Sequence, residues 1–273
     1  MIALSPQDSR YPPGLRDLDR PPDPLWIDGD VAALTASAIA IVGTRRMTGY
    51  GERVARELAI ACAAAGTVVV SGLAQGIDST AHRGALDGGG RTIAVLGESI
   101  PSFVATVRGR RRPLVPRIRE RGLLASQFAA PFSARGWMFA ERDATIAALA
   151  SAVVVVEAGE VSGALITAEA ARRLGRVLYA VPGPIGSAAS IGTNRLIAAG
   201  LARALTGADV LVPGRGAAPP VDRVLEALRD GPLSLDDIAR RARLPALLVS
   251  TRVASLLVRG QVVTLPDGRL RCA

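Results

Sequence analysis

Lysine is absent from this 273-residue chain: every one of its basic residues is an arginine. The absence excludes a Walker-type phosphate lysine, a Schiff-base lysine and a lysine nucleophile. The 33 basic residues stand against 24 acidic residues, so the net charge is +9. Because arginine binds phosphate through paired donors and stacks on bases, the excess is compatible with a nucleic-acid partner, although a biased composition explains it equally well.

Histidine, cysteine and aromatic residues are also scarce. The single histidine, His82, excludes a metal site built from histidines, and Cys62 and Cys272 form neither a metal-binding pair nor a disulfide framework. Both cysteines are therefore expected to be structural. Aromatic residues make up 3% of the chain, which gives no evident platform for stacking bases. We expect no metal and no cofactor.

Long apolar runs are missing as well. None approaches the ~18 uninterrupted residues of a membrane span, and the start, MIALSPQDSR, lacks the basic-then-apolar order of a signal peptide. We therefore expect a cytoplasmic protein without membrane contact. With 49% hydrophobic residues, the chain is long enough for one large α/β core and a small second domain.

Short apolar runs alternate with helical patterns from Ala38 to about Val212. The runs are AIAIVG, TVVVSG, RTIAVLG, AVVVVEAG and RVLYAVPG, and helices are expected at about 51–65, 78–86, 164–174 and 194–204. Strands that are apolar on both sides and separated by helices are typical of a parallel sheet covered on both faces. The pattern predicts an α/β fold with a Rossmann-like, doubly wound and mostly parallel sheet.

The composition divides the chain into four parts. Residues 1–35 form a Pro- and Asp-rich extension that we expect to pack on the core, 36–212 form the Rossmann-like domain, and 213–220 form a Gly/Pro linker. Residues 221–273 show three helical patterns and a two-stranded wing, which predicts a small winged-helix domain. The polar residues of its candidate recognition helix are Ser250, Thr251, Arg252 and Arg259. Winged helices contact DNA or protein, and the sequence leaves both open.

Four of the predicted strands end in loops rich in small polar residues, at 43–46, 71–82, 157–167 and 182–194. Because the carboxyl ends of parallel strands share one edge of the sheet, these loops are expected to meet and to offer amides, hydroxyls and arginines to phosphates. None is a GxGxxG fingerprint with an acidic ribose reader, so a dinucleotide is poorly supported. The candidate phosphate-binding residues are Gly43, Thr44, Arg45, Arg46, Ser71, Gly72, Gln75, Gly76, Asp78, His82, Arg83, Arg142, Ser162, Gly163, Thr167, Gly183 and Asn194.

Each of these features also has a purely structural interpretation. Glycine-rich turns occur in every doubly wound domain. Asp78 is placed to cap the helix that carries His82, and His82 to make a positioning hydrogen bond. Glu157 and Glu169 are candidates for a carboxylate pair, but a glutamate at the end of a strand is as often a loop anchor.

Several motifs resemble, in their order and spacing, the DNA-processing protein A family, also called DprA or Smf. They are YPPGLRDLDRPPDPLWIDGD, AIVGTRRMTGYG, VVSGLAQGIDSTAHRGAL, RTIAVLG, VVVVEAGEVSGALITAEAA and AVPGPIGSAASIGTNRLIAAG. The resemblance covers nearly the whole chain. It implies a protein, usually dimeric, that binds single-stranded DNA, protects incoming strands in natural transformation and helps to load the RecA recombinase. Arg45 lies at the position of the family's phosphate-contacting arginine.

Three segments depart from the family pattern. Gln75 stands where the family has an arginine. In 98–127, residues 98–122 replace a Tyr-Pro and Asn segment and the following LLASQF replaces a Ser-Glu motif, and Glu141–Asp143 replaces a cationic cluster. These departures weaken the inference of DNA contact there. Seven arginines against one acid between 108 and 121 offer another cationic surface, for which a solvated loop is the alternative. The auxiliary candidates are Arg108, Arg110, Arg111 and Arg112.

Two functions follow from these observations. We favour non-enzymatic binding of single-stranded DNA, in which arginines and backbone amides follow the phosphates. The alternative is a nucleotide-binding or nucleotide-cleaving enzyme on the same fold, which would use Glu157 or Glu169 with the 43–46 turn. The sequence identifies no clear catalytic constellation.

Overall fold

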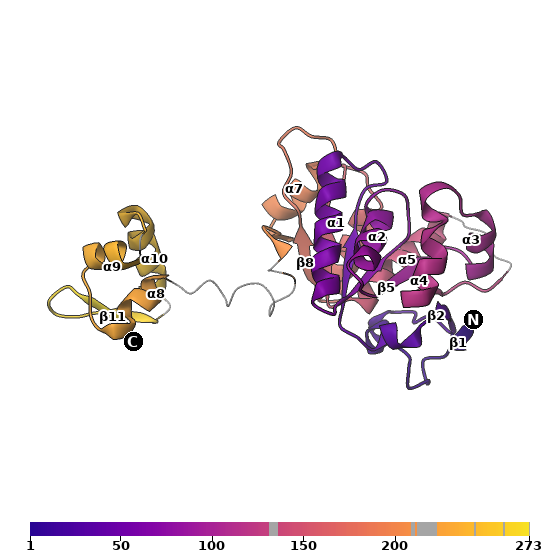
Figure 1. Cartoon of the computed structure of the whole chain (residues 1–273), viewed down its shortest axis with the longest axis horizontal. Helices are drawn as coiled ribbons and strands as arrows, with labels where there is room; N and C mark the ends of the chain where they lie inside the picture. Colours follow the sequence, from indigo (N-terminus) through magenta and orange to yellow (C-terminus); the bar gives the residue numbers. More distant parts are fainter. Residues whose placement is uncertain (131–135, 209–210, 212–222, 243, 259, 273) are drawn as a thin grey trace. The chain divides into compact units, whose positions relative to one another are not determined.

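A computed structural model describes residues 1–130, 136–208, 211, 223–242, 244–258 and 260–272 (Figure 1). The chain divides into two compact units, Met1–Val212 and Pro213–Ala273. The predicted linker at 213–220 lies outside the described residues. Among the described helices, none is both long enough and apolar enough to cross a membrane.

The first unit is built on a nine-stranded sheet with the order β1-β2-β6-β5-β4-β3-β7-β8-β9. All neighbouring pairs from β6 to β9 are parallel, and β1 and β2 are antiparallel, which confirms the predicted mostly parallel sheet. The strands are β1 (Ile2–Leu4), β2 (Leu25–Gly29), β3 (Ala38–Val42), β4 (Val68–Ser71), β5 (Thr92–Leu96), β6 (Gly122–Ser126), β7 (Ala152–Val155), β8 (Val177–Ala180) and β9 (Arg203–Ala204).

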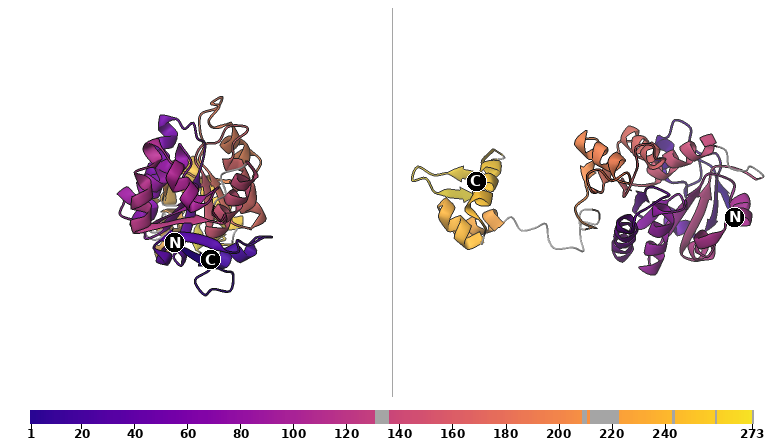
Figure 2. Two further views of the ribbon diagram at one scale, coloured as in Figure 1. Left: turned by 90° about the vertical axis from the view of Figure 1, so that its right-hand side faces the viewer. Right: turned by 90° about the horizontal axis from the view of Figure 1, so that it is seen from above.

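Helices cover both faces of the sheet because alternate strand residues point to opposite sides. In β3, Ile39 and Ile41 pack under α1 and α2, whereas Ala40 and Val42 belong to the core under α5 and α6. Figure 2 shows the two helical layers from two further directions. The helices are α1 (Gly49–Ala64), α2 (Ile77–Asp87), α3 (Ile100–Thr106), α4 (Leu114–Arg121), α5 (Gly136–Leu149), α6 (Ala164–Arg173) and α7 (Ile191–Ala198).

The N-terminal extension is part of the sheet rather than a segment laid on it. β2 pairs with β6, with Trp26 opposite Ser126, and β1 adds outside β2. Two short 3-10 helices, η1 (Pro13–Asp17) and η2 (Val31–Leu34), complete the extension. Another difference concerns the helix expected at 194–204, which ends at Ala198; Gly200 has a φ of +67° and the chain then enters β9.

The second unit consists of α8 (Arg223–Ala227), η5 (Leu228–Asp230), α9 (Leu235–Ala242), α10 (Ala246–Val258) and the hairpin β10 (Val262–Thr264) and β11 (Leu270–Cys272). Its helices and hairpin share one core, to which Ile238, Val249 and Leu256 contribute. The order of three helical segments followed by a hairpin confirms the predicted winged helix.

Candidate nucleic-acid interface

The loops after β3 and β7 meet at the point where the sheet changes its direction of growth. β3 lies between β4 and β7. The strands β4, β5 and β6 are added on one side of β3, and β7, β8 and β9 are then added on its other side. Ligands of open α/β sheets bind beyond the strand ends at such a switch point. A cavity of about 500 Å³ lies there, and we call it the switch-point pocket. Its lining includes Gly43, Thr44, Arg45, Arg46, Asp78, Phe139, Arg142, Asp143, Ser162, Gly163 and Thr167.

The strand-end amides already hold an anion, the buried carboxylate of Asp78. The amide of Gly72 donates to Asp78 Oδ2 at 3.2 Å, and the amides of Gly43 and Ala74 donate to the same carboxyl. Burial raises the pKa of Asp78, while Arg142 and these amides act in the opposite direction. The predicted cap of α2 is wrong, because Asp78 caps no amide of that helix. It ties the β3 and β4 loops together instead.

Arg142, predicted as a DNA contact, is a buried cation that holds backbone. Its Nη1 donates to the carbonyl of Gly72 at 2.6 Å and to that of Val95 at 3.2 Å. Its Nε lies 3.1 Å from Asp143 Oδ1, and the residue is only 4% exposed. A Cβ at position 72 would overlap the Arg142 guanidinium, which explains the glycine there. The structure therefore corrects the role of Arg142 from phosphate contact to positioning residue.

Sequence reasoning missed Phe139 and gave Asp143 no role of its own. The Phe139 ring lies 5.6 Å from the guanidinium carbon of Arg45 and 5.8 Å from that of Arg142. Burial raises the pKa of Asp143 to about 6; Arg142 and Arg45 lower it, whereas Asp78 raises it further. Phe139 precedes Arg142 by three residues, a spacing that puts both on one face of a helix.

Two other predicted DNA contacts, His82 and Ser71, are buried, and their side chains already have hydrogen-bond partners. His82 is fully buried, and its Nδ1 lies 2.6 Å from Thr92 Oγ1. Burial lowers its pKa to about 3, so the ring is neutral and inaccessible to DNA. The hydroxyl of Ser71 is equally buried and donates to the carbonyl of Ile41 at 2.7 Å. The predicted positioning bond of His82 exists, but its partner is Thr92.

The 182–194 loop is closed by its own residues. The side-chain amide of Asn194 donates to the carbonyl of Gly183 at 3.0 Å, and its oxygen accepts from the amide of Gly183 at 3.1 Å. A Cβ at Gly183 would overlap Ser190. These two predicted site residues do not line the switch-point pocket, so they shape the neighbouring loop.

A second cavity, of about 610 Å³, lies on the other side of Arg45. We call it the arginine pocket. Its cations are Arg45, Arg83, Arg108, Arg110 and Arg111, and none of its described lining residues is acidic. The remaining lining comes from Met47, Gln75, Gly76, Ser79, Thr80 and Gly109. The structure thus brings three of the auxiliary candidates to Arg83 and Arg45, whereas Arg112 is not part of the lining.

The segment before α4 places these arginines. It forms a 3-10 turn, η3 (Gly109–Arg111), and Gly109 adopts a φ of +62° that favours glycine. Arg108 Nη1 donates to the carbonyls of Ala105 and Val107, and the guanidinium of Arg111 lies 5.8 Å from the ring of Phe103. Arg110 and Arg112 are exposed, whereas Arg83 on α2 is half-buried.

The carboxylates of the alternative enzyme do not form a pair at this site. Glu157 is buried and accepts from the Thr48 amide at 2.9 Å and from its hydroxyl at 2.5 Å, beside the first turn of α1. Glu169 pairs with Arg172 and Arg173 on α6. Across the described ranges, no cluster of three His, Cys, Asp or Glu side chains is placed to hold a metal.

The candidate recognition helix α10 exposes leucines. Leu247 is 78% exposed and Leu248 is 56% exposed. The hydroxyls of Ser250 and Thr251 donate back to the carbonyls of residues 246 and 247. Arg252 is half-buried, and Arg259 lies outside the described residues.

Two family models of known proteins match the two units of the chain. The family model described as DNA recombination-mediator protein A matches residues 3–213, and that of the DprA winged helix domain matches residues 212–268. Protein Smf of Escherichia coli K12 is 33% identical, over 98% of this chain and 77% of that protein.

Two solved structures are similar. DNA processing protein A from Streptococcus pneumoniae has a TM-score of 0.71 and 34% identity, over 78% of this chain and 74% of that one. The protein from Helicobacter pylori, whose structure is described as giving its single-stranded DNA binding mode, has a TM-score of 0.68 and 29% identity, over 74% of this chain and 90% of that one. The motif resemblance is confirmed, and the chain belongs to the DNA recombination-mediator protein A family, that of DprA and Smf.

Proposed function

We propose that this protein is a non-enzymatic binder of single-stranded DNA in DNA processing. The observation that carries the proposal is the arginine pocket, in which five arginines surround one cavity without an acidic neighbour among the described lining residues. A related protein, that of Helicobacter pylori, is described by its single-stranded DNA binding mode.

The strand would pass from the arginine pocket to the switch-point pocket across Arg45, which lines both. Because Asp78 occupies strand-end amides, phosphates would rely on guanidinium groups and on the Ser162–Gly163 turn. Phosphate neutralisation releases counterions, so affinity should fall steeply with salt. Concave pockets admit the flexible backbone of a single strand more readily than a stiff duplex.

The test is a fluorescence-anisotropy titration of the full chain with a labelled oligothymidine and with a duplex of equal length, over a series of salt concentrations. Preference for the single strand and a steep linear decrease of log affinity with log salt support the proposal. Equal affinity for both forms, or a flat salt response, contradicts it. A mononucleotide in the same assay tests the nucleotide-binding alternative.

The proposal includes no catalytic step, since Glu157 and Glu169 are engaged by Thr48 and by neighbouring arginines. It extends to loading of the RecA recombinase, to a homodimer and to a cytoplasmic location. RecA loading and the homodimer rest on the family resemblance alone, and the cytoplasmic location rests on the lack of a long apolar run in the sequence.

A further inference from the structure

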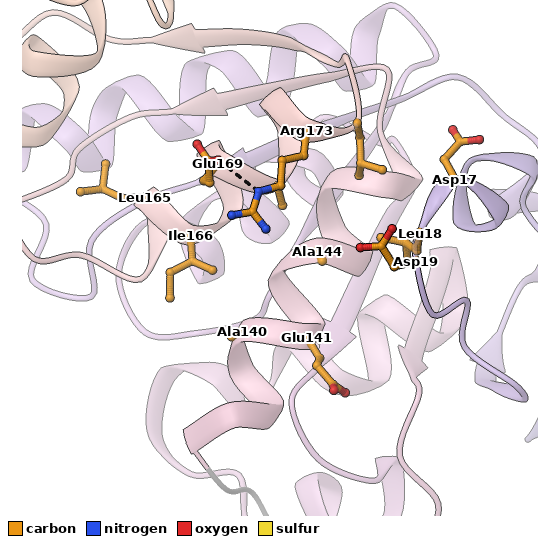
Figure 3. Close-up of a pocket in the computed structure, with 12 residues that line it drawn as sticks. Asp17, Leu18, Asp19, Ala140, Glu141, Ala144, Leu165, Ile166, Glu169 and Arg173 are labelled. Carbon is orange, nitrogen blue, oxygen red and sulfur yellow. Dashed lines mark hydrogen bonds and ion pairs between the residues drawn. The ribbon is translucent and has the colours of Figure 1, made fainter.

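The α5–α6 side of the first unit carries an apolar groove of about 650 Å³ whose floor is made of small residues (Figure 3). We call it the α5–α6 groove. The small lining residues are Ala140 and Ala144 of α5 and Ala170 of α6, and we call these three its floor. Figure 3 shows the α5 alanines between the loop that carries Asp19 and the α6 side chains of Ile166 and Arg173. The apolar walls come from Leu18, Leu165, Ile166 and Leu174.

Carboxylates border this groove, although the chain as a whole has a net charge of +9. Among the residues that line it, Arg173 is the single cation. It pairs with Glu169 at 3.1 Å, and Arg172, outside the lining, pairs with the same carboxylate at 3.2 Å. The acidic residues are Asp17, Asp19, Glu141 and Glu169. The charged residues that line the groove are therefore mainly acidic, whereas those that line the arginine pocket are all basic.

The groove also exposes apolar surface, which its acidic residues do not account for. Ile166 is 47% exposed at the edge of the groove, where it continues the apolar lining and offers apolar surface to a partner. Asp19 is exposed, whereas Asp17 pairs with Arg176 at 2.6 Å and Glu141 accepts from Gln127 at 3.1 Å. An acidic rim around an apolar cavity matches a ligand that is apolar in the middle and cationic at its ends.

The groove adjoins the switch-point pocket, with which it shares Ala140 and Ile166. DNA itself does not suit the groove, because the carboxylates repel phosphates. A protein segment in the groove would lie beside a strand held in the neighbouring pocket.

We propose that the α5–α6 groove docks a basic amphipathic segment of a partner protein. Aliphatic side chains of that segment pack on the alanine floor, as an amphipathic helix does in a hydrophobic groove. Its arginines or lysines meet the rim carboxylates, which fix the direction of the segment. This function goes beyond the binding of DNA and does not depend on it.

The probe is a short synthetic helical peptide with a leucine face and arginines at both ends, labelled with fluorescein. A matched peptide carries glutamate in place of each arginine. Both are titrated with the full chain by fluorescence anisotropy without DNA. Specific binding of the arginine peptide, with the glutamate peptide at least tenfold weaker, is the expected result. Equal binding of the two peptides, or no binding of either, overturns the proposal.

Three variants locate the site. Ala144→Trp fills the floor and should weaken the arginine peptide by about tenfold or more, since it removes the cavity for the leucines. Asp19→Arg reverses one rim charge and should weaken it by about two- to fivefold. Glu57→Arg makes the same reversal at an exposed position on α1, across the sheet, and should leave binding unchanged. Equal losses with Glu57→Arg and Asp19→Arg overturn the proposal, and this comparison stands even where Ala144→Trp does not fold.

Two further readouts separate the explanations. The affinity for oligothymidine in the same samples should be unchanged in Ala144→Trp and Asp19→Arg, so a failure of DNA binding is distinguished from a failure of docking. Sedimentation of the chain alone tests a second copy as the occupant. Self-association that is lost in Ala144→Trp and Asp19→Arg overturns the proposed partner in favour of a second copy.

Discussion

Arg142 Nη1 donates a hydrogen bond of 2.6 Å to the carbonyl oxygen of Gly72, so a cation on α5 fastens the loop that follows β4. The same guanidinium lies against the carboxylate of Asp143, and Asp78 adds a second carboxylate to the cluster. One buried arginine thus offsets two buried acids directly beneath the candidate phosphate site. The loops depend on this cluster for their positions, and in the proposed function the exposed Arg45 supplies a contact to DNA.

Removal of Arg142 should destabilise the whole first unit. Arg142→Met leaves Asp78 and Asp143 buried without their cation, which is expected to cost about 3 to 5 kcal/mol of unfolding free energy. Chemical denaturation measures the loss. The control is Arg46→Ala at an exposed position, which should stay within about 0.5 kcal/mol of the parent protein. Equal stability of the two variants would show that Arg142 is not the partner of these acids.

Much of this sheet could be predicted from the sequence, because each central strand is a continuous apolar run such as Ala38–Val42. The strands β1 and β2 could not, since a strand as short as Ile2–Leu4 carries no periodicity and owes its structure to pairing with its neighbour. The sequence from Ile100 to Arg121 departs from the family pattern and predicts no helix or strand, whereas the structure places α3 and α4 there.

The site was predicted in outline but not in its charge pairing. The loops meet at the sheet edge, as expected for parallel strands. The sequence position of Asp78 suggests a helix cap. Only the folded structure shows that its carboxyl accepts hydrogen bonds from the amides of Gly72 and Gly43. The charge of Arg142 predicts a contact with DNA at the surface. Its burial depends on how α5 packs over β4 and β5, which no local pattern contains.

Arg45 should matter most for DNA affinity. Arg45→Ala removes a charge-assisted contact shared by both pockets, so the affinity for oligothymidine should fall by roughly 10- to 100-fold and the salt slope by about one unit. Thermal unfolding should change little, because the side chain is exposed. Arg20→Ala, at an exposed position of the N-terminal extension, is the matched control. A lowered melting temperature with an unchanged salt slope would instead assign Arg45 to the support of a neighbouring loop.

Two arginines of one segment should differ in their effect. Arg110 lines the arginine pocket and Arg112, two residues later, does not. Arg110→Ala is therefore expected to lower the salt slope by about 0.7 and to weaken binding severalfold, with a smaller effect for Arg112→Ala. Anisotropy titrations at several salt concentrations compare the two. Equal losses would indicate that the segment acts only through its net charge.

DNA affinity should depend on pH through Asp143. The pKa of this carboxyl is raised to about 6, mainly by burial, so it gains a proton as the pH falls through that value. Protonation removes a negative charge near Arg45 and should strengthen DNA binding severalfold between about pH 7.5 and 5.5. The DNA affinity of Asp143→Asn should change little over this pH range. The pKa of His82, about 3, keeps that ring neutral throughout.

The raised pKa of Asp143 also makes the stability of the fold depend on pH. Because the folded-state pKa of Asp143 lies above its ordinary value of 3.8, the folded form holds the proton more tightly than the unfolded chain does. Its contribution to stability is therefore largest at low pH and is lost as the pH rises from about 4 through 6. Asp143→Asn should flatten this part of the pH profile, and an unchanged profile in the variant would assign the dependence to another group.

Removal of the second unit should leave DNA binding largely intact. Both pockets are lined by residues of Met1–Val212, and the first unit has its own core. The truncation must end after Val212, because Leu205 and Leu211 are buried in that core. A chain that ends there is expected to unfold cooperatively and to bind oligothymidine within a fewfold of the full chain. A shorter chain that ends before Leu205 should melt at a lower temperature, since it exposes apolar surface of the core. Loss of most DNA affinity in the longer truncation, at an unchanged melting temperature, would place the main binding surface in the winged helix and remove the arginine pocket from the interface.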